Sequence, residues 1–288
     1  MEFQQYQHAA QKTLQPTPPG IDPALIPLLG LSGEAGSVAS AYKKGLRDEP
    51  ARRLAKARMR EELGDLLWYL AAVARQWDLD LEDIAAANLA KITDRWRPTP
   101  ASMIRFDDAC PPAERLPRHA IFRFSLEPNA AGRTVLILRK DGTPVGDPLT
   151  DASHIEDSYQ FHDIFHLSHV AVLGWSPVMR ALLKCKRRSQ PGTDEAEDGG
   201  RAIAIEEGVS ALVFAYAARH NYLDRVQHLD SQLLDTIGTM VAHLEVSAHR
   251  SADWELAIIT GYNAWRYLRN HGGGTVELDM ERQRLTVL

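Results

Sequence analysis

Two carboxylates three residues apart offer the clearest chemistry in this sequence. Glu62 and Asp65 lie in a run whose apolar residues recur with the i, i+3, i+4, i+7 spacing of a half-buried helix. Side chains three apart on a helix are neighbours, so the two carboxylates share one face, about 5–6 Å apart at Cβ. Beside an apolar stripe, such a pair either binds a cation or remains in water as two solvated acids.

Further polar groups before and after this pair extend the pattern. Glu34 stands in the glycine-rich stretch Gly30–Gly36, which lies on another predicted helix. Downstream, Asn88, Lys91 and Arg95 follow each other at i, i+3 and i+7 along one side of a third helix. Acids from two helices and cations from a third suit a polyphosphate that a metal ion bridges to the protein.

A second cluster of chemically active residues lies in the other half of the chain. Its members are histidines and acids at helical spacing, namely His162, Asp163, His166 and the pair Glu206 and Glu207. Histidine nitrogens and carboxylate oxygens together bind transition metals. The same residues also suit a buried network of hydrogen bonds or, for the two glutamates, a favourable interaction with a helix N-terminus. The sequence leaves these alternatives open.

Length and composition are those of an ordinary globular protein. The chain has 288 residues, 44% of them hydrophobic and 25% charged, which is enough for two domains with a sizeable core. The formal net charge of −5 provides no electrostatic basis for a nucleic-acid-binding surface. The chain has only two cysteines, no apolar run of about 18 residues and no signal peptide, which favours a cytoplasmic protein without a membrane span.

The hydrophobic pattern predicts the helices that position the acids. A short amphipathic helix is expected over residues 2–14, and a second helix from about Pro23. The stretch 60–96 continues the helical pattern, with a new helix capped by Asp80. Prolines then mark a linker over residues 98–118.

The second half of the chain changes character. β-Branched and aromatic runs at 120–124, 134–138, 275–279 and 284–288 predict a small antiparallel ribbon that joins both ends of the second domain. The charged, glycine-rich stretch 189–201 is too polar to pack, and it is therefore predicted to be a mobile loop.

The order of these motifs resembles the MazG-like family of all-α nucleoside triphosphate pyrophosphohydrolases. The resemblance covers about residues 2–97 and rests on four stretches, Phe3–Gln7, Gly30–Lys44, Glu61–Leu70 and Asn88–Lys91. Residues 146–265 also resemble the C-terminal domain that is fused to some MazG-like proteins. That second resemblance rests on Phe161–His166, Leu173–Pro177, Glu197–Ala202, Glu206–Gly208 and Leu244–Ser247.

The resemblance implies a mainly α protein built from two domains. The expected fold is an N-terminal four-helix unit over residues 1–97, followed by the linker over 98–118. A second helical domain with the antiparallel β ribbon is expected over residues 119–288.

The resemblance also implies a reaction, the Mg²⁺-dependent hydrolysis of nucleoside or deoxynucleoside triphosphates to the monophosphate and pyrophosphate. Members of the family hold magnesium with two pairs of acids. By that analogy Glu34, Glu62 and Asp65 hold Mg²⁺, with Mn²⁺ as an alternative. Ser37 stands where the family has the acid that partners Glu34.

The remaining roles follow from the same resemblance. Glu61 or Glu62 is expected to orient the attacking water, and Lys91 and Arg95 to neutralise the departing pyrophosphate. The nucleotide-binding residues that the resemblance implies are Lys44, Asn88, Lys91 and Arg95. Family members commonly form their pocket between subunits, which implies a homodimer.

Two other functions remain open. Ser37 suggests a nucleotide-sensing module whose N-terminal site is degenerate, with Asp163, His166 and Glu207 acting as a metal phosphohydrolase site in the second domain. Alternatively, the chain is a non-enzymatic interaction protein, and its polar clusters belong to a satisfied core.

Overall fold

The chain divides into two compact units, which we describe separately. A computed structural model describes residues 1–288 except 48, 97–103, 152 and 155, and the side chains of residues 49–55 and 94–96 also lie outside the description. Unit 1 comprises Met1–Thr93, and unit 2 comprises Asp94–Leu288. Across the described residues, no helix is both long and apolar enough to span a membrane.

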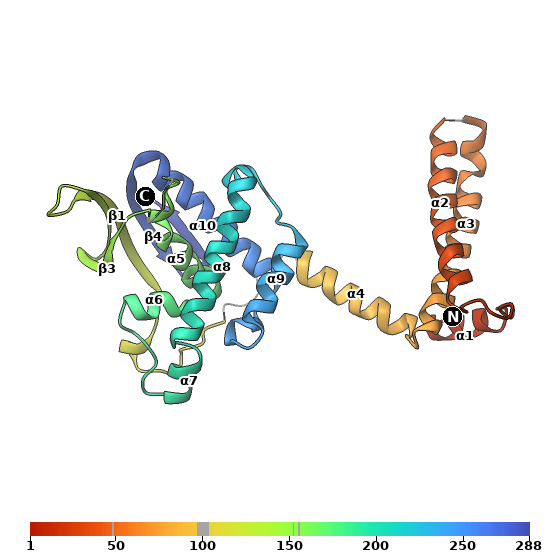
Figure 1. Ribbon diagram of the computed structural model, residues 1–288, viewed down its shortest axis with the longest axis horizontal. Coiled ribbons are helices and arrows are strands. Elements are labelled where there is room, and N and C mark those ends of the chain that lie inside the picture. Colours follow the sequence, from red (N-terminus) through yellow and green to blue (C-terminus); the bar gives the residue numbers. More distant parts are fainter. Residues whose placement is uncertain (48, 97–103, 152, 155) are drawn as a thin grey trace. The chain divides into compact units, whose positions relative to one another are not determined.

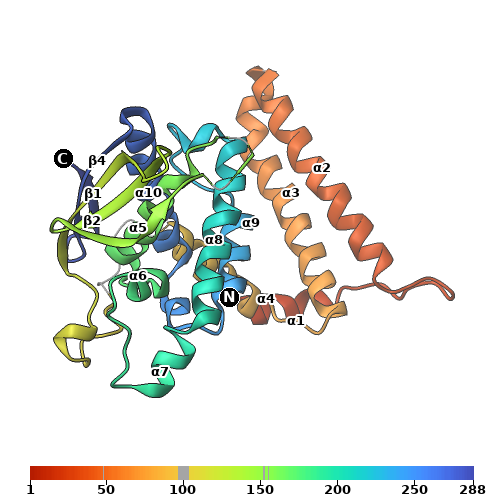
Figure 2. The same ribbon diagram turned by 60° about the vertical axis from the view of Figure 1, so that its left-hand side comes forward.

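Unit 1 is helical, as predicted. Its elements are α1 (Phe3–Gln11), α2 (Leu25–Arg47), α3 (Glu49–Gln76) and α4 (Leu81–Trp96). Helices α2 and α3 run side by side as a long antiparallel pair (Figures 1 and 2). They approach closely because Gly30 has no side chain: a Cβ atom there would lie 2.1 Å from the ring of Tyr69 on α3.

A small core and a few polar contacts hold α1 against the rest of unit 1. The buried residues of this core are Ala10, Ala71, Ala74 and Leu81, with Tyr6 and Trp68 packed against them. The side-chain amide of Gln7 donates to the carbonyl of Leu79 (2.8 Å) and accepts from the backbone N–H of Leu81 (2.9 Å). Gln7 therefore satisfies backbone groups at the start of α4 that have no partner within that helix.

Unit 2 combines helices with one antiparallel sheet. Its longer helices are α5 (Asp163–Leu173), α8 (Gly200–Arg219), α9 (Ser231–Val241) and α10 (Ser251–His271). Two shorter helices are α6 (Pro177–Leu182) and α7 (Pro191–Ala196). Short 3₁₀ turns occupy Pro112–Glu114, Tyr159–Phe161, Asn221–Leu223 and Glu245–Ala248.

The sheet joins the two ends of unit 2, which confirms the predicted ribbon. The strands are β1 (His119–Pro128), β2 (Thr134–Lys140), β3 (Thr143–Leu149), β4 (Gly273–Asp279) and β5 (Arg284–Val287), in the order β3-β2-β1-β4-β5. Strand β1 pairs antiparallel with both β2 and β4. Phe122 and Phe124 of β1 are buried while their neighbours are more exposed, so one face of the sheet supports the core.

Helices α5 and α10 pack together against strands β4 and β5 (Figure 1). Every residue of α5 is buried, including Asp163, His166 and His169. A helix that is buried on all sides has no solvated face, so its polar side chains must find partners inside the protein.

Two sequence-based expectations for unit 2 need correction. The first concerns the predicted linker, of which residues 98–103 lie outside the described residues. Residues 104–118 pack into unit 2, where Cys110 and Leu116 are buried and Asp107 accepts a hydrogen bond from Arg180 at 2.7 Å. Prolines stop regular structure, but they do not prevent a segment from packing.

The predicted mobile loop over residues 189–201 is the second correction. The segment contains helix α7 and the start of α8, and Asp198 within it is fully buried. The Arg187 guanidinium donates to Asp198 at 2.7 Å. The polar composition of this stretch therefore reflects an internal ion pair, which a count of charged residues does not detect.

Candidate functional site

Three carboxylates from α2 and α3 converge in unit 1. Glu34 of α2 and Glu62 and Asp65 of α3 each present a carboxylate oxygen within 4.8 Å of the other two. Glu62 and Asp65 lie on one face of α3 because they are three residues apart. Glu34 joins them because α2 and α3 run side by side. Glu34 and Glu62 are half-buried, and Asp65 is exposed.

The donor set suits a hard divalent cation. Mg²⁺ prefers carboxylate and water oxygens at about 2.0–2.1 Å, which places octahedral ligands roughly 3–4 Å from one another. Oxygens within 4.8 Å of each other need only a small movement of their side chains to reach that geometry. Three negative charges this close also repel each other unless a cation lies between them.

Three glycines close in sequence to the acids face open space. A side-chain carbon built at Gly33, Gly36 or Gly64 would meet no atom within 4 Å. These glycines flank Glu34 on α2 and precede Asp65 on α3. Packing within this chain does not require these three glycines, whereas Gly30 is required by helix packing.

Arg58 and Tyr6 also lie near the acids, although neither was among the predicted site residues. The Arg58 guanidinium lies 3.5 Å from Glu62, one turn earlier on α3. Burial, and secondarily the charge of Asp65, raises the pKa of the Tyr6 phenol. An i, i+4 spacing of Arg58 and Glu62 was visible in the sequence, but Tyr6 comes from a different helix.

Ser37 occupies the position one turn after Glu34. It is half-buried on α2, and its hydroxyl is uncharged. A serine contributes a weaker, neutral oxygen where a carboxylate would contribute a charged one. The cluster therefore has three acids.

The other predicted site residues of unit 1 do not join this cluster. Glu61, Lys44, Asn88 and Lys91 are exposed. Within the described part of the chain, no hydrogen bond or ion pair connects Lys44, Asn88 or Lys91 to the three acids. Lys44 follows Glu34 by ten residues, about 15 Å along the helix. The side chain of Arg95 lies outside the described residues.

The second cluster is centred on a fully buried carboxylate of α8. Both Glu206 oxygens are used: Oε1 accepts from Nδ1 of His166 and of His169, each at 2.9 Å. Oε2 accepts from the Ser176 hydroxyl (3.0 Å) and the Val178 backbone N–H (2.9 Å). Four donors around one carboxylate make a satisfied network, and His169 and Ser176 belong to it although the predicted second site omitted them.

A second group of the same cluster lies on the other side of His166. His162, His166 and Glu207 each present a ligand-type atom within 4.8 Å of the other two. Asp163 lies beside them, with its Oδ1 3.7 Å from Nε2 of His162. The five residues of the predicted second site therefore come together around His166.

Burial and charge compete at His166. Burial opposes protonation, but the negative charges of Glu206 and Glu207 outweigh it and raise the pKa of His166 to about 10. Burial raises the pKa of Asp163. For Glu206, burial is overcome by the charge and hydrogen bond of His166, which lower its pKa to about 2. The acids of this cluster therefore require a positive charge on or beside the His166 ring.

Two family models match this chain in comparisons with known proteins. One, described as the MazG C-terminal domain, matches residues 101–288. The other, described as the MazG nucleotide pyrophosphohydrolase domain, matches residues 26–98.

Similarity to individual proteins is more limited. The Gene 37 protein of Mycobacterium phage L5 is 41% identical over 69 residues, which are 23% of this chain and 60% of that protein. The chain thus spans about three fifths of the length of this curated relative. No solved structure matches the chain.

Proposed function

We propose that this chain, which belongs to the MazG family, hydrolyses nucleoside or deoxynucleoside triphosphates to the monophosphate and pyrophosphate. The observation that carries the proposal is the convergence of Glu34, Glu62 and Asp65 from two helices. Members of the family that act as pyrophosphohydrolases generally depend on a divalent metal ion, and the all-oxygen donor set of this cluster favours Mg²⁺, with Mn²⁺ as the alternative.

The three acids would hold the ion, and the chain's other residues would act on the substrate around it. A bound Mg²⁺ bridges phosphate oxygens and lowers the pKa of a coordinated water. Glu61 or Glu62 would orient the water for attack on the α-phosphorus.

Cations would neutralise the charge that develops on the departing pyrophosphate. Lys91 and Arg95 are assigned this role, with Asn88 and Lys44 as further nucleotide-binding residues. Within the described part of one chain no hydrogen bond or ion pair joins Lys91 to the acids. In the homodimer that the family resemblance implies, a second copy of the chain would supply these groups.

The exposed apolar surface of unit 1 supports a homodimer. Leu29, Leu63, Trp77 and Leu89 are between 48% and 70% exposed, although unit 1 has only a small buried core. Large apolar side chains exposed in this number are expected on a surface that associates when they form one patch. A second copy of unit 1 would cover them and would bring a further set of cations toward the acids.

Replacing Leu29 by glutamate is expected to convert the dimer to a monomer, because a charge would be buried in the apolar interface. Leu29 is 64% exposed in the isolated chain, so the substitution leaves the core of the monomer intact. Light scattering coupled to gel filtration measures the molar mass. Leu256→Glu, at an exposed leucine of α10 in unit 2, is the matched control and should remain dimeric. A Leu29→Glu protein that keeps the mass of the wild type would contradict this interface.

The reaction itself is tested with a panel of nucleoside triphosphates and Mg²⁺ or Mn²⁺, with pyrophosphate and orthophosphate measured separately. Pyrophosphate is the expected product, because attack at the α-phosphorus releases it. Orthophosphate would indicate a different phosphohydrolase. Nucleotide binding without turnover would favour the sensing module that Ser37 suggests, and the absence of both nucleotide and metal binding would leave an interaction protein.

A further inference from the structure

We propose that unit 2 binds a divalent transition-metal ion, Zn²⁺ or a chemically similar ion, through His162, His166 and Glu207, with Asp163 beside them. This site is separate from the three acids of unit 1, and it does not depend on the proposed hydrolysis. Four observations carry it: the state of His166, the orientation of His162, the placement of the two carboxylates, and the chemistry of the donor set.

One nitrogen of the His166 ring is available to bind a metal ion. Its Nδ1 donates to the carboxylate of Glu206 at 2.9 Å, so Nε2 is the nitrogen left for a metal ion, which would take the place of a proton there. That Nε2 is fully buried and has no hydrogen-bond partner. A metal-bound histidine typically donates its other nitrogen to a carboxylate, which is the arrangement of His166 and Glu206.

His162 presents the same nitrogen toward the same place. Its Nδ1 donates to the carbonyl of Tyr159 at 2.9 Å, so Nε2 is again the free ligand atom. The Tyr159 ring stacks on the His162 ring, with centroids 4.6 Å apart and an angle of 6° between the planes. His162 and His166 are at positions i and i+4, so both rings project from neighbouring turns where α5 begins.

The carboxylates complete the donor set. Glu207 Oε1 lies 3.6 Å from Nε2 of His166, and Asp163 Oδ1 lies 3.7 Å from Nε2 of His162. Ligands about 2.0–2.1 Å from a tetrahedral Zn²⁺ are roughly 3.4 Å from each other. These separations are too long for hydrogen bonds and close to the spacing that a shared ion requires.

The neighbouring trio of His166, His169 and Glu206 is not the proposed site, although its ligand atoms are also close together. In that trio each histidine already donates Nδ1 to Glu206, and both oxygens of Glu206 have partners. A metal there would have to displace hydrogen bonds, whereas at Nε2 of His166 it would satisfy an atom that has none.

The mixed donor set selects the type of ion. Imidazole nitrogens favour Zn²⁺ and related transition metals, whereas oxygen-only sites such as the acids of unit 1 favour Mg²⁺. The Glu207 side chain is 41% exposed and that of His162 is 15% exposed, so solvent reaches this side of the cluster. His162, His166 and Glu207 are three protein ligands. A tetrahedral ion would have a fourth position, which Asp163, water or a substrate would fill.

Cobalt(II) titration of the full-length protein tests the proposal, because Co²⁺ bound to histidine in a low-coordinate site absorbs visible light. The Asp65→Ala variant serves as the background, so that the acids of unit 1 do not contribute. We expect one Co²⁺ per chain, displaced by one equivalent of Zn²⁺. In that background, His162→Gln and Glu207→Gln should each weaken binding by at least tenfold, since each removes a ligand.

The controls separate loss of the site from loss of the fold. His220→Gln removes an exposed histidine of unit 2 whose Nδ1, like that of His162, contacts a backbone carbonyl, and it should bind Co²⁺ as the background does. Circular dichroism melting verifies that His162→Gln and Glu207→Gln, both at partly exposed positions, remain folded. No Co²⁺ binding in the folded background, or unchanged binding in both variants, would overturn the proposal. Neither result bears on pyrophosphate release by the wild type.

Discussion

Replacing Asp65 by alanine is expected to lower kcat/KM for pyrophosphate release by at least about 100-fold, equivalent to roughly 2.7 kcal/mol of transition-state stabilisation. The substitution removes one of three carboxylates that converge within 4.8 Å, so the ion would lose a ligand and part of its charge compensation. Asp65 is exposed and α3 is long, so the fold should be preserved.

Glu62→Gln should lower kcat/KM for pyrophosphate release to the same extent, but its activity should depend differently on the Mg²⁺ concentration. The amide keeps the shape of the side chain but not its charge, so a higher concentration of Mg²⁺ should recover part of the activity. Measuring pyrophosphate release against Mg²⁺ concentration for wild type, Glu62→Gln and Asp65→Ala separates weaker metal binding from misfolding. Glu62 also lies 3.5 Å from Arg58, which the amide can still contact.

The control is Asp78→Asn, because Asp78 has a left-handed backbone (φ 54°) that asparagine tolerates and alanine does not. Asp78 is an exposed acid just after α3 that pairs only loosely with Arg75, at 3.3 Å, and it lies outside the cluster. Exposed pairs of this type contribute little to stability or function. Wild-type turnover by Asp65→Ala, or an equal loss in Asp78→Asn, would show that the three acids do not form the catalytic site.

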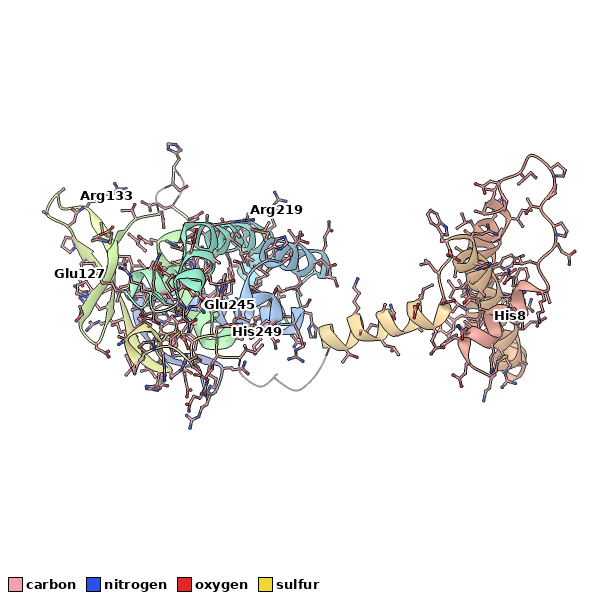
Figure 3. The ribbon with its side chains drawn as sticks, turned by 90° about the horizontal axis from the view of Figure 1, so that it is seen from below. His8, Glu127, Arg133, Arg219, Glu245 and His249 are labelled. Atoms are coloured by element: carbon pink, nitrogen blue, oxygen red, sulfur yellow. The ribbon has the colours of Figure 1, made fainter. Side chains whose placement is uncertain are left out.

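Replacing Asp198 by alanine is expected to destabilise unit 2 by about 3–5 kcal/mol, because it removes one of the two carboxylates that compensate the buried charge of Arg187. The Arg187 side chain is fully buried and donates to Asp198 and to Glu245, each at 2.7 Å. Glu245, labelled in Figure 3, belongs to the turn between α9 and α10. Asp198 thus connects the segment before α8 to Arg187 and, through it, to this turn.

Thermal and urea denaturation of the full chain measure this effect, with the fluorescence of the unit 2 tryptophans as the signal of unfolding. For a unit of this size, each kcal/mol corresponds to about 2–4 °C in Tm, so a fall of roughly 6–20 °C is expected. Pyrophosphate release at low temperature should persist, since Asp198 is remote in sequence from the acids of unit 1.

An exposed ion pair provides the matched control. On the sheet, Arg139 of β2 donates to Glu127 of β1 at 2.5 and 2.9 Å, but water has access to both side chains. Glu127→Ala should therefore change Tm little. If Asp198→Ala and Glu127→Ala melt alike, the burial of the Arg187 pair does not control the stability of unit 2.

The sequence by itself determined the features that arise from short-range geometry. The helices of unit 1 followed from apolar periodicity, and the common face of Glu62 and Asp65 followed from their i, i+3 spacing. The ribbon joining 120–124 to 275–279 was also predicted, because β-branched and aromatic runs bounded by turn residues stand at both ends of the second domain.

Only the tertiary structure decided which charged side chains meet. Glu34 joins Glu62 and Asp65 because Gly30 lets α2 approach α3, and that approach depends on an aromatic ring 39 residues away. Asp198 appeared to belong to a solvated loop, since a local count of charges contains no information about Arg187 and its burial. His166 and Glu206 are 40 residues apart, so no helical spacing predicts that one ring nitrogen is satisfied and the other is left free. Local spacing fixes the face on which a side chain lies, whereas its partner and its exposure to water depend on how distant elements pack.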